Sequence, residues 1–285
     1  MTQLRTIMKK PITIENDSSL YHAISKMLQE NISRLLVKID TTYGIITEKD
    51  IGMFLLNDDS EKNLDQIPVS QIMNRIITVN DAMDVETCIE IMLERGIGSL
   101  AVTRNNEGIV GLITKTDIAQ YYIEKYTGKH TVGDLMTVSY VSMRSDDNLK
   151  DVVSKMIEEK ISRIFLKNEN NEPEGILTFR DLFNVALEQG NTDVVLDNSD
   201  DAISVIFSRK GFLSDSGFGK TIKAKDVMTK TFETVDFTED IGVACQDMVQ
   251  NRINGLGVRI NGKLAGVVSK TDVLKAIHVE SKSKS

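Results

Sequence analysis

The sequence has few of the residues that build metal centres and disulfide frameworks. It contains two cysteines and three histidines in 285 residues. The histidines (His22, His130 and His278) show no zinc-ligand spacing, so we expect no metal site. Cys88 and Cys245 fall on the apolar stripes of two predicted helices, so we expect small core residues rather than a disulfide or metal ligands.

Long apolar runs and an excess of basic charge are also missing. No run approaches the roughly 18 residues that a membrane helix needs, and the amino terminus lacks a secretory pattern. We therefore expect no membrane span and a cytoplasmic location. Lysine and arginine total 34 against 42 aspartate and glutamate, a net charge of −8. An acidic chain without a basic face is a poor candidate for nucleic-acid binding.

The sequence shows no recognisable catalytic set. No Ser/His/Asp or Cys/His combination falls at a predicted strand end, and no paired acids mark a cleft. The stretch 214–221 ends like a phosphate-binding loop, but Ser214 replaces the first glycine and no long helix follows. We expect a Gly-rich surface loop there and no enzyme. Few repeated aromatics mean that no interface stands out either.

What the sequence does contain is a fourfold repeat. The motif is Gly, two apolar residues, Thr or Ser, two further residues, Asp and an apolar residue. It occurs at 44–51, 111–118, 175–182 and 266–273. Each copy predicts a short strand that turns into a helix, with the hydroxyl and the carboxylate on the turn. A repeat of this regularity determines the fold class.

Two further features recur with the motif. An apolar stripe with the i, i+3, i+4, i+7, i+8 spacing of a one-sided helix begins at Leu20, Val85, Leu149 and Ile241. An apolar residue followed by Met marks the start of each repeat, at 7–8, 72–73, 135–136 and 227–228. Together these features predict the order strand, helix, strand, strand, helix in a unit of about 55 residues.

The turn of the motif has a structural interpretation and a functional one. Thr or Ser followed three residues later by an acid is the capping-box pattern, which satisfies amides of the first helical turn. Two observations favour a further role: the acid is always Asp although Glu suits the cap better, and each turn carries a cation that the helix dipole disfavours. These cations are Lys49, Lys115, Arg180 and Lys270. A bound phosphate would stabilise them, and Asp would then hold another group, such as ribose hydroxyls.

The repeated start, the amphipathic helix and the Gly-to-Asp motif resemble the CBS domain, named after cystathionine beta-synthase. The resemblance implies an α+β fold of four CBS units, each a small mixed sheet with two helices, paired into two Bateman modules with ligand sites in clefts between paired copies. The expected units are 4–59, 69–126, 132–189 and 224–280, with an insertion or linker at 190–223. The layout is similar to that of the gamma subunit of AMP-activated protein kinase.

The resemblance also implies ligand-binding residues. The expected ribose ligands are Asp50, Asp117, Asp181 and Asp272. The expected phosphate ligands are Thr47, Thr114, Thr178, Ser269, Arg34, Arg163, Arg180 and Lys49. The expected adenine contacts are Ile12, Thr13, Ile77, Thr78, Val141 and Ser142. Arg34 and Arg163 occur only in repeats one and three, which predicts two stronger anion sites, although each could equally be a solvated charge.

The function implied by the resemblance is regulatory. An adenosine compound such as AMP, ADP or ATP would bind, serve in energy sensing and signal to a protein partner that the sequence does not name, with no cofactor besides this regulatory ligand. The alternatives are a docking scaffold without ligand, an S-adenosylmethionine binder and a nucleic-acid binder. The four repeats could close into a disc within one chain, or two chains could form a homodimer.

Overall fold

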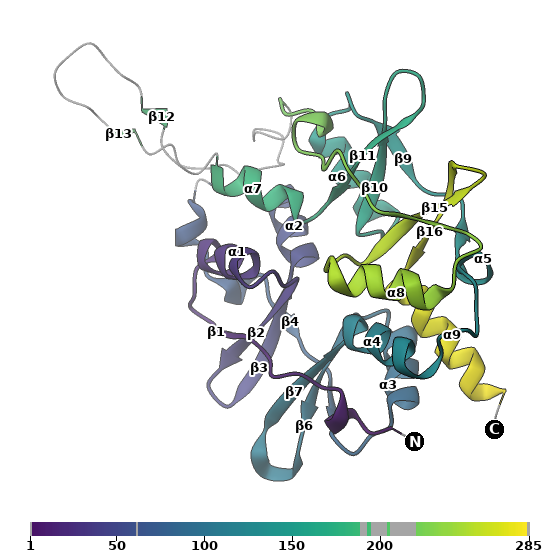
Figure 1. The fold of residues 1–285 in the computed structure, drawn as a ribbon. Coiled ribbons are helices and arrows are strands. Elements are labelled where there is room, and N and C mark those ends of the chain that lie inside the picture. The colour runs from purple at the N-terminus through teal and green to yellow at the C-terminus, as the bar shows by residue number, and fades with distance from the viewer. Residues whose placement is uncertain (1, 61, 189–192, 195–203, 206–220, 284–285) are drawn as a thin grey trace. The chain divides into compact units, whose positions relative to one another are not determined.

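The computed structural model describes residues 2–60, 62–188, 193–194, 204–205 and 221–283 (Figure 1). The chain forms two compact units. Unit 1 comprises Met1–Ile12, Ile76–Tyr140 and Phe232–Ser285, and unit 2 comprises Thr13–Arg75 and Val141–Thr231. Most of the predicted insertion, including nearly all of the loop at 214–221, lies outside the described residues. Within it, β12 (Asp193–Val194) pairs with β13 (Ser204–Val205) in antiparallel fashion.

Unit 2 contains the main elements of repeats one and three, in the predicted order. Repeat one consists of β1 (Thr13–Glu15), α1 (Leu20–Gln29), β2 (Arg34–Ile39), β3 (Thr42–Thr47) and α2 (Glu48–Asn57). Repeat three consists of β9 (Ser142–Arg144), α6 (Leu149–Glu158), β10 (Arg163–Lys167), β11 (Pro173–Thr178) and α7 (Asp181–Glu188).

Unit 1 contains the main elements of repeats two and four. Repeat two consists of β5 (Thr78–Asn80), α3 (Val85–Arg95), β6 (Ser99–Thr103), β7 (Ile109–Thr114) and α4 (Lys115–Lys125). Repeat four consists of β14 (Thr234–Asp236), α8 (Ile241–Gln250), β15 (Gly255–Ile260), β16 (Lys263–Ser269) and α9 (Lys270–Lys282).

Each repeat builds a small mixed sheet. The first strand runs parallel to the second, because the first helix connects them as a crossover, and the third strand pairs antiparallel with the second. Two sheets gain a fourth strand from elsewhere in the chain: β4 (Asn74–Arg75) pairs with β3, and β8 (Thr137–Val138) pairs with β16. The sheets thus place every Thr/Ser-x-x-Asp turn at a strand-to-helix junction.

The predicted apolar stripes form the buried faces of the first helices. In each helix the first four stripe positions are buried and the fifth is half-buried. The fully buried set is Leu20, Ala23, Ile24, Met27, Val85, Cys88, Ile89, Leu149, Val152, Val153, Met156, Ile241, Ala244, Cys245 and Met248 at 0% exposure, with Met92 at 1%. In unit 1, side chains of α3, α4, α8 and α9 share one hydrophobic core. Burial of this apolar surface is the main stabilising contribution.

The opening segments of the repeats explain why Gly and Met recur together. Each opening segment is a short helical turn followed by Met: η1 (Leu4–Thr6), η3 (Val69–Gln71), α5 (Val132–Leu135) and η6 (Ala224–Asp226). A Cβ atom added to Gly44 would lie 2.9 Å from the Met73 sulfur, and one added to Gly175 would lie 2.6 Å from the Met228 sulfur. The motif position is therefore glycine because any side chain there would overlap the opening Met that packs against it.

This packing exchanges segments between consecutive repeats. Met73 opens repeat two but contacts Gly44 of repeat one, and Met8 opens repeat one but contacts Gly111 of repeat two. The opening Met residues of repeats three and four contact Gly266 of repeat four and Gly175 of repeat three in the same way. The α+β class with four repeats is confirmed, and the reciprocal exchange is consistent with the predicted pairing into two Bateman modules.

Candidate functional site

All four predicted turns have the same hydrogen-bond pattern around the Asp carboxylate. Oδ2 of Asp accepts hydrogen bonds from the backbone N–H and from the hydroxyl of the Thr or Ser three residues earlier. In repeat one these distances to Asp50 Oδ2 are 2.9 Å from Thr47 N and 2.5 Å from Thr47 Oγ1. Helix capping is therefore one real role of the motif. It uses Oδ2 and leaves Oδ1 for other groups.

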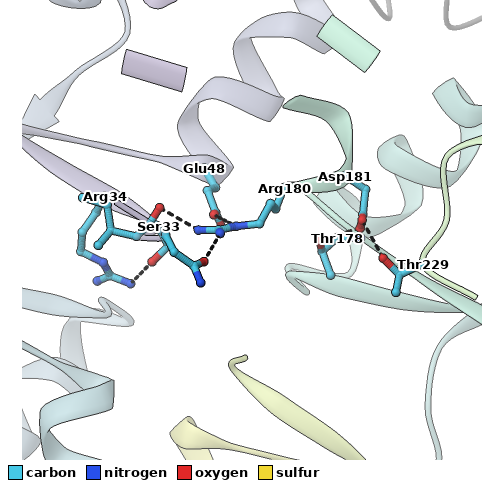
Figure 2. Close-up of polar contacts among 9 residues, drawn as sticks. Ser33, Arg34, Glu48, Thr178, Arg180, Asp181 and Thr229 are labelled. Atoms are coloured by element: carbon cyan, nitrogen blue, oxygen red, sulfur yellow. Dashed lines mark hydrogen bonds and ion pairs between the residues drawn. The ribbon is translucent and has the colours of Figure 1, made fainter. Parts of the chain in front are cut away.

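The second carboxylate oxygen has a neutral partner in both turns of unit 2. The Asn74 side-chain amide donates to Asp50 Oδ1 at 2.8 Å. The Thr229 hydroxyl donates to Asp181 Oδ1 at 3.0 Å (Figure 2). Both aspartates are half-buried, so these oxygens lie at places where solvent reaches the side chain.

The second oxygen has a cationic partner in both turns of unit 1. Lys9 Nζ lies 3.2 Å from Asp117 Oδ1, and Lys275 Nζ lies 3.0 Å from Asp272 Oδ1. Both carboxylates are buried, with Asp117 4% exposed and Asp272 6% exposed. The four aspartates therefore share one hydrogen-bond pattern at Oδ2 but differ in the charge and access of their outward oxygen.

A hollow of about 430 Å³ lies beside Asp50 in unit 2. Asp50 and Asn74 form part of its wall, together with Met53 and Phe54 of α2 and with Ile72. Its size falls within the range of small-molecule sites, but its wall is more polar than is usual for them, with six polar residues and three apolar ones. Two further acids near the end of α2, Asp58 and Asp59, also line it. The hollow thus suits an uncharged group better than a phosphate.

The sheet register places the predicted arginines beside the predicted hydroxyls. Arg34 lies directly opposite Thr47 in the β2–β3 pair, and Arg163 lies opposite Thr178 in the β10–β11 pair. Directly opposed residues of antiparallel strands have Cβ atoms about 5 Å apart. Arg34 also donates a hydrogen bond to Ser33 Oγ at 3.3 Å. The predicted role of these arginines in phosphate binding stays a prediction.

Arg180, a predicted phosphate ligand, takes part in a polar cluster within unit 2 (Figure 2). Its Nε donates to Glu48 Oε1 at 2.7 Å, and its Nη2 donates to the Ile32 carbonyl at 2.8 Å. Its Nη1 donates to Asn31 Oδ1. Burial raises the pKa of Glu48 above its ordinary value of 4.5, although the Arg180 charge opposes this shift. The cation in this turn therefore already has an acidic partner.

The turn cations of unit 1 also contact the neighbouring turn. Lys115 donates to the Thr271 hydroxyl at 2.7 Å, and Lys270 donates to the Thr116 hydroxyl at 2.9 Å. The contact between Glu48 and Arg180 in unit 2 follows the same rule. In each case the residue directly after the capping Thr or Ser of one repeat contacts the residue two positions after the capping Thr or Ser of the other repeat. From the sequence we grouped these four cations together, but their positions differ. Lys49 and Arg180 lie two residues after the capping Thr, whereas Lys115 and Lys270 lie one residue after the capping Thr or Ser.

The predicted adenine contacts lie where strands begin. Thr13, Thr78 and Ser142 are the first residues of β1, β5 and β9, with Ile77 and Val141 immediately before two of these strands. The carbonyl of Ile77 accepts a hydrogen bond from the Ala101 N–H at 3.0 Å, so its main chain already takes part in a sheet. Ile12 is the last residue of its segment in unit 1. Adenine binding by these residues stays a prediction.

The partners of the second carboxylate oxygen were not predicted. Lys9, Asn74 and Thr229 each directly follow the opening Met of a repeat. That shared position is the signal that could have identified them. In repeat three the same position is Thr137, whereas Asp272 is contacted by Lys275 from its own helix.

The described residues include no group of three or more His, Cys, Asp or Glu side chains placed to hold a metal ion. Cys88 and Cys245 are free and buried, as expected for core residues, and burial raises the pKa of both thiols to about 12. Within the part of the chain that the structure describes, no helix has the length and apolar character needed to cross a bilayer.

Comparison with known proteins identifies the family. The model of the CBS domain matches residues 4–56, 69–124, 132–188 and 224–279, which is more than half of the chain. The chain therefore belongs to the CBS-domain family. Proteins built from CBS domains are generally regulatory rather than catalytic.

Two archaeal relatives match most of the chain. Protein MJ1225 of Methanocaldococcus jannaschii is 24% identical over 283 residues, which cover 94% of this chain and 95% of the relative. A protein encoded in the ribosomal RNA operon of Thermofilum pendens is 26% identical over 243 residues, covering 81% of this chain and 75% of the relative.

Solved structures share the fold. The crystal structure of MJ1225, put forward as an archaeal homologue of g-AMPK, superposes with a TM-score of 0.78 at 22% identity and covers 97% of this chain and 100% of that chain. An uncharacterised conserved protein from Pyrococcus horikoshii superposes with a TM-score of 0.59 at 17% identity and the same coverage. At these identities the comparison shows the four-repeat fold.

Proposed function

We propose that this protein is a regulatory module that binds an adenosine nucleotide at its Thr/Ser-x-x-Asp turns. The observation that carries the proposal is the arrangement at Asp50. Its Oδ2 is fixed by the helix cap, while its Oδ1 accepts a hydrogen bond from the neutral Asn74 amide, and both residues line a hollow of about 430 Å³. Carboxylates fixed in this way are suited to accept hydrogen bonds from ribose hydroxyls.

The nucleotide would bind with its nucleoside part toward the hollow. A ribose hydroxyl would replace the Asn74 amide on Asp50 Oδ1, so the number of hydrogen bonds to the carboxylate is kept. The phosphates would point away from Asp58 and Asp59, toward the start of α2 and Arg34, because like charges repel and the guanidinium fork suits phosphate. Thr47 would reach phosphate only by turning its hydroxyl away from Asp50.

Regulation would follow from a difference in nucleotide affinity between two arrangements of the repeats. A ligand shifts such an equilibrium only by its differential affinity for the two states. The proposal includes a role in energy sensing and a cytoplasmic location. It also includes a protein partner that binds one arrangement of the repeats in preference to the other. S-adenosylmethionine is an alternative ligand, because it carries the same ribose hydroxyls that the aspartate would bind.

Isothermal titration of the full chain with AMP, ADP, ATP and S-adenosylmethionine tests the proposal. We expect saturable binding of at least one compound, with an upward shift of the melting temperature because the ligand binds the folded state. Failure of all four to bind would overturn the proposal. The aspartates would then serve only as helix caps, in a scaffold that docks other proteins.

A further inference from the structure

We propose that nucleotide binding is confined to unit 2, at Asp50 and Asp181, because lysines of unit 1 form ion pairs with the corresponding carboxylates there. This inference rests on the proposed function and specifies where in the chain it resides. It predicts two nucleotide sites per chain, in repeats one and three, although all four repeats carry the complete motif.

The hydrogen bonds at Oδ2 leave Oδ1 as the carboxylate oxygen that determines whether a ribose can bind. In every turn Oδ2 accepts two hydrogen bonds from the capping residue, so a ribose hydroxyl has to bind at Oδ1. In unit 2 this oxygen holds one neutral donor, Asn74 or Thr229. A hydroxyl of a ribose can replace either donor with no change in charge and with the same number of hydrogen bonds.

In unit 1 the same replacement would break an ion pair. Lys9 and Lys275, whose side chains are 70% and 60% exposed, approach carboxylates whose side chains are only 3% and 9% exposed. Each lysine supplies a charge-assisted contact to a buried carboxylate from the solvent side, and a neutral hydroxyl in its place would recover only part of that interaction. Asp117 Oδ1 is inaccessible to solvent and accepts no hydrogen bond from the described residues, so Lys9 contacts it as an ion pair only. The lysine partner therefore acts against binding of a neutral hydroxyl at both Asp117 and Asp272, and the inaccessibility of Oδ1 acts against it at Asp117 as well.

An independent feature of the sheets divides the repeats in the same way. The residue opposite the capping hydroxyl is Arg34 in repeat one and Arg163 in repeat three. In repeats two and four that residue is Ser99 and Gly255, respectively. The repeats whose carboxylate has a neutral partner are thus the repeats that place a guanidinium beside the turn.

Hydrogen-exchange mass spectrometry on the unmodified chain, with AMP and ATP as probes, tests the assignment without any substitution. We expect nucleotide to slow exchange in peptides covering 47–54 and 178–186. We expect no change in peptides covering 114–121 and 269–276. Protection centred on the latter two peptides would overturn the inference while leaving the proposed function intact.

Titration of variants provides the second test. Asp50→Asn and Asp181→Asn should each weaken nucleotide binding at one site at least tenfold, and the double variant should remove both sites. Asp134→Asn is the matched control, because Asp134 forms the same capping box with Thr131 at the start of α5, an exposed turn. Melting curves verify that every variant is folded.

The outcomes separate the two proposals. A stoichiometry near two that falls to zero in the double variant supports both. A stoichiometry near four, or weakened binding in Asp117→Asn or Asp272→Asn, overturns the restriction to unit 2 and leaves the nucleotide-binding function standing. Absence of binding to both AMP and ATP overturns the inference and counts against the proposed function as well.

Discussion

At the scale of single residues, Glu48 shows that burial can outweigh a nearby opposite charge. Its carboxylate lies 2.7 Å from the Arg180 guanidinium, and its side chain is 15% exposed. Loss of hydration raises its pKa even so. Such a pair is a modest source of stability when intact, but removal of one partner is costly because the other is left buried and charged.

We therefore expect Arg180→Ala to lower the free energy of unfolding by about 2 kcal/mol, measured by urea denaturation at neutral pH. The double variant Glu48→Gln/Arg180→Ala should recover part of this loss, since no buried charge remains. Lys49→Ala, which alters the adjacent turn cation, is the control, with an expected change below about 0.5 kcal/mol. If Arg180→Ala is as stable as the natural protein, water must hydrate the Glu48 carboxylate well enough to replace the lost guanidinium.

The raised pKa of Glu48 also predicts a pH dependence. A carboxyl whose pKa is higher in the folded state stabilises the fold fully below its ordinary pKa of 4.5, and this contribution is lost as the pH rises through the higher folded value. The stability of the natural protein relative to Glu48→Gln should thus fall as the pH rises above the ordinary pKa of 4.5. Urea denaturation at several pH values measures it, and a rising difference would contradict the assignment.

At the scale of elements, the contact between α2 and the turn before α7 depends on a glycine. A Cβ atom on Gly52 would meet Cδ1 of Phe179, a side chain that is 3% exposed. Replacing Gly by Ala within a helix normally stabilises it by up to about 1 kcal/mol. Here the added methyl group has no space, so the packing of Phe179 should decide the outcome.

We expect Gly52→Ala to destabilise the protein by about 1–2 kcal/mol, because overpacking exceeds the gain in helix propensity. In a Phe179→Leu background the same substitution should cost little or become favourable. Thermal and urea unfolding of the four variants in this cycle give the coupling energy. A stabilising effect of Gly52→Ala in the natural background would show that Phe179 can move aside.

Elements with local signals were predictable from the sequence, whereas contacts between distant segments were not. The stripes that begin at Leu20 and Ile241 gave the correct helices, because periodicity reports a buried face directly. The cap formed by Thr47 and Asp50 was likewise predictable, because the pattern that indicates it spans only four consecutive residues. The pairing of Glu48 with Arg180 joins residues far apart in sequence, and no local pattern specifies it. Lys9, Asn74 and Thr229 also lie far in sequence from the aspartates that they contact, and only their shared position after the opening Met could have indicated them.

At the scale of the whole molecule, each unit combines repeats that are not consecutive. Unit 1 contains the helices of repeats two and four in one core, and unit 2 contains repeats one and three. The opening segments nevertheless link repeat one with two and repeat three with four. Cutting the chain between repeats two and three would therefore divide the core of unit 1, exposing apolar faces of α3 and α4.

We expect a fragment of residues 1–126 to self-associate when expressed alone, because a second copy is the available cover for these apolar faces. Mixed with a fragment of residues 132–285, it should form a 1:1 complex that restores the unfolding behaviour of the intact chain. Size-exclusion chromatography with light scattering measures both states. A monomeric fragment that unfolds cooperatively would contradict the dependence of repeat two on repeat four.

The division of the chain into units has a consequence for the order in which the protein matures on the ribosome. The chain passes from one unit to the other four times, after Ile12, Arg75, Tyr140 and Thr231. All of unit 2 has been translated by Thr231, whereas unit 1 also requires α8 and α9, which follow. Since domains fold as units during synthesis, the nascent chain can complete unit 2 while α3 and α4 still lack their partners. The unit proposed to bind nucleotide is thus the one that can mature first.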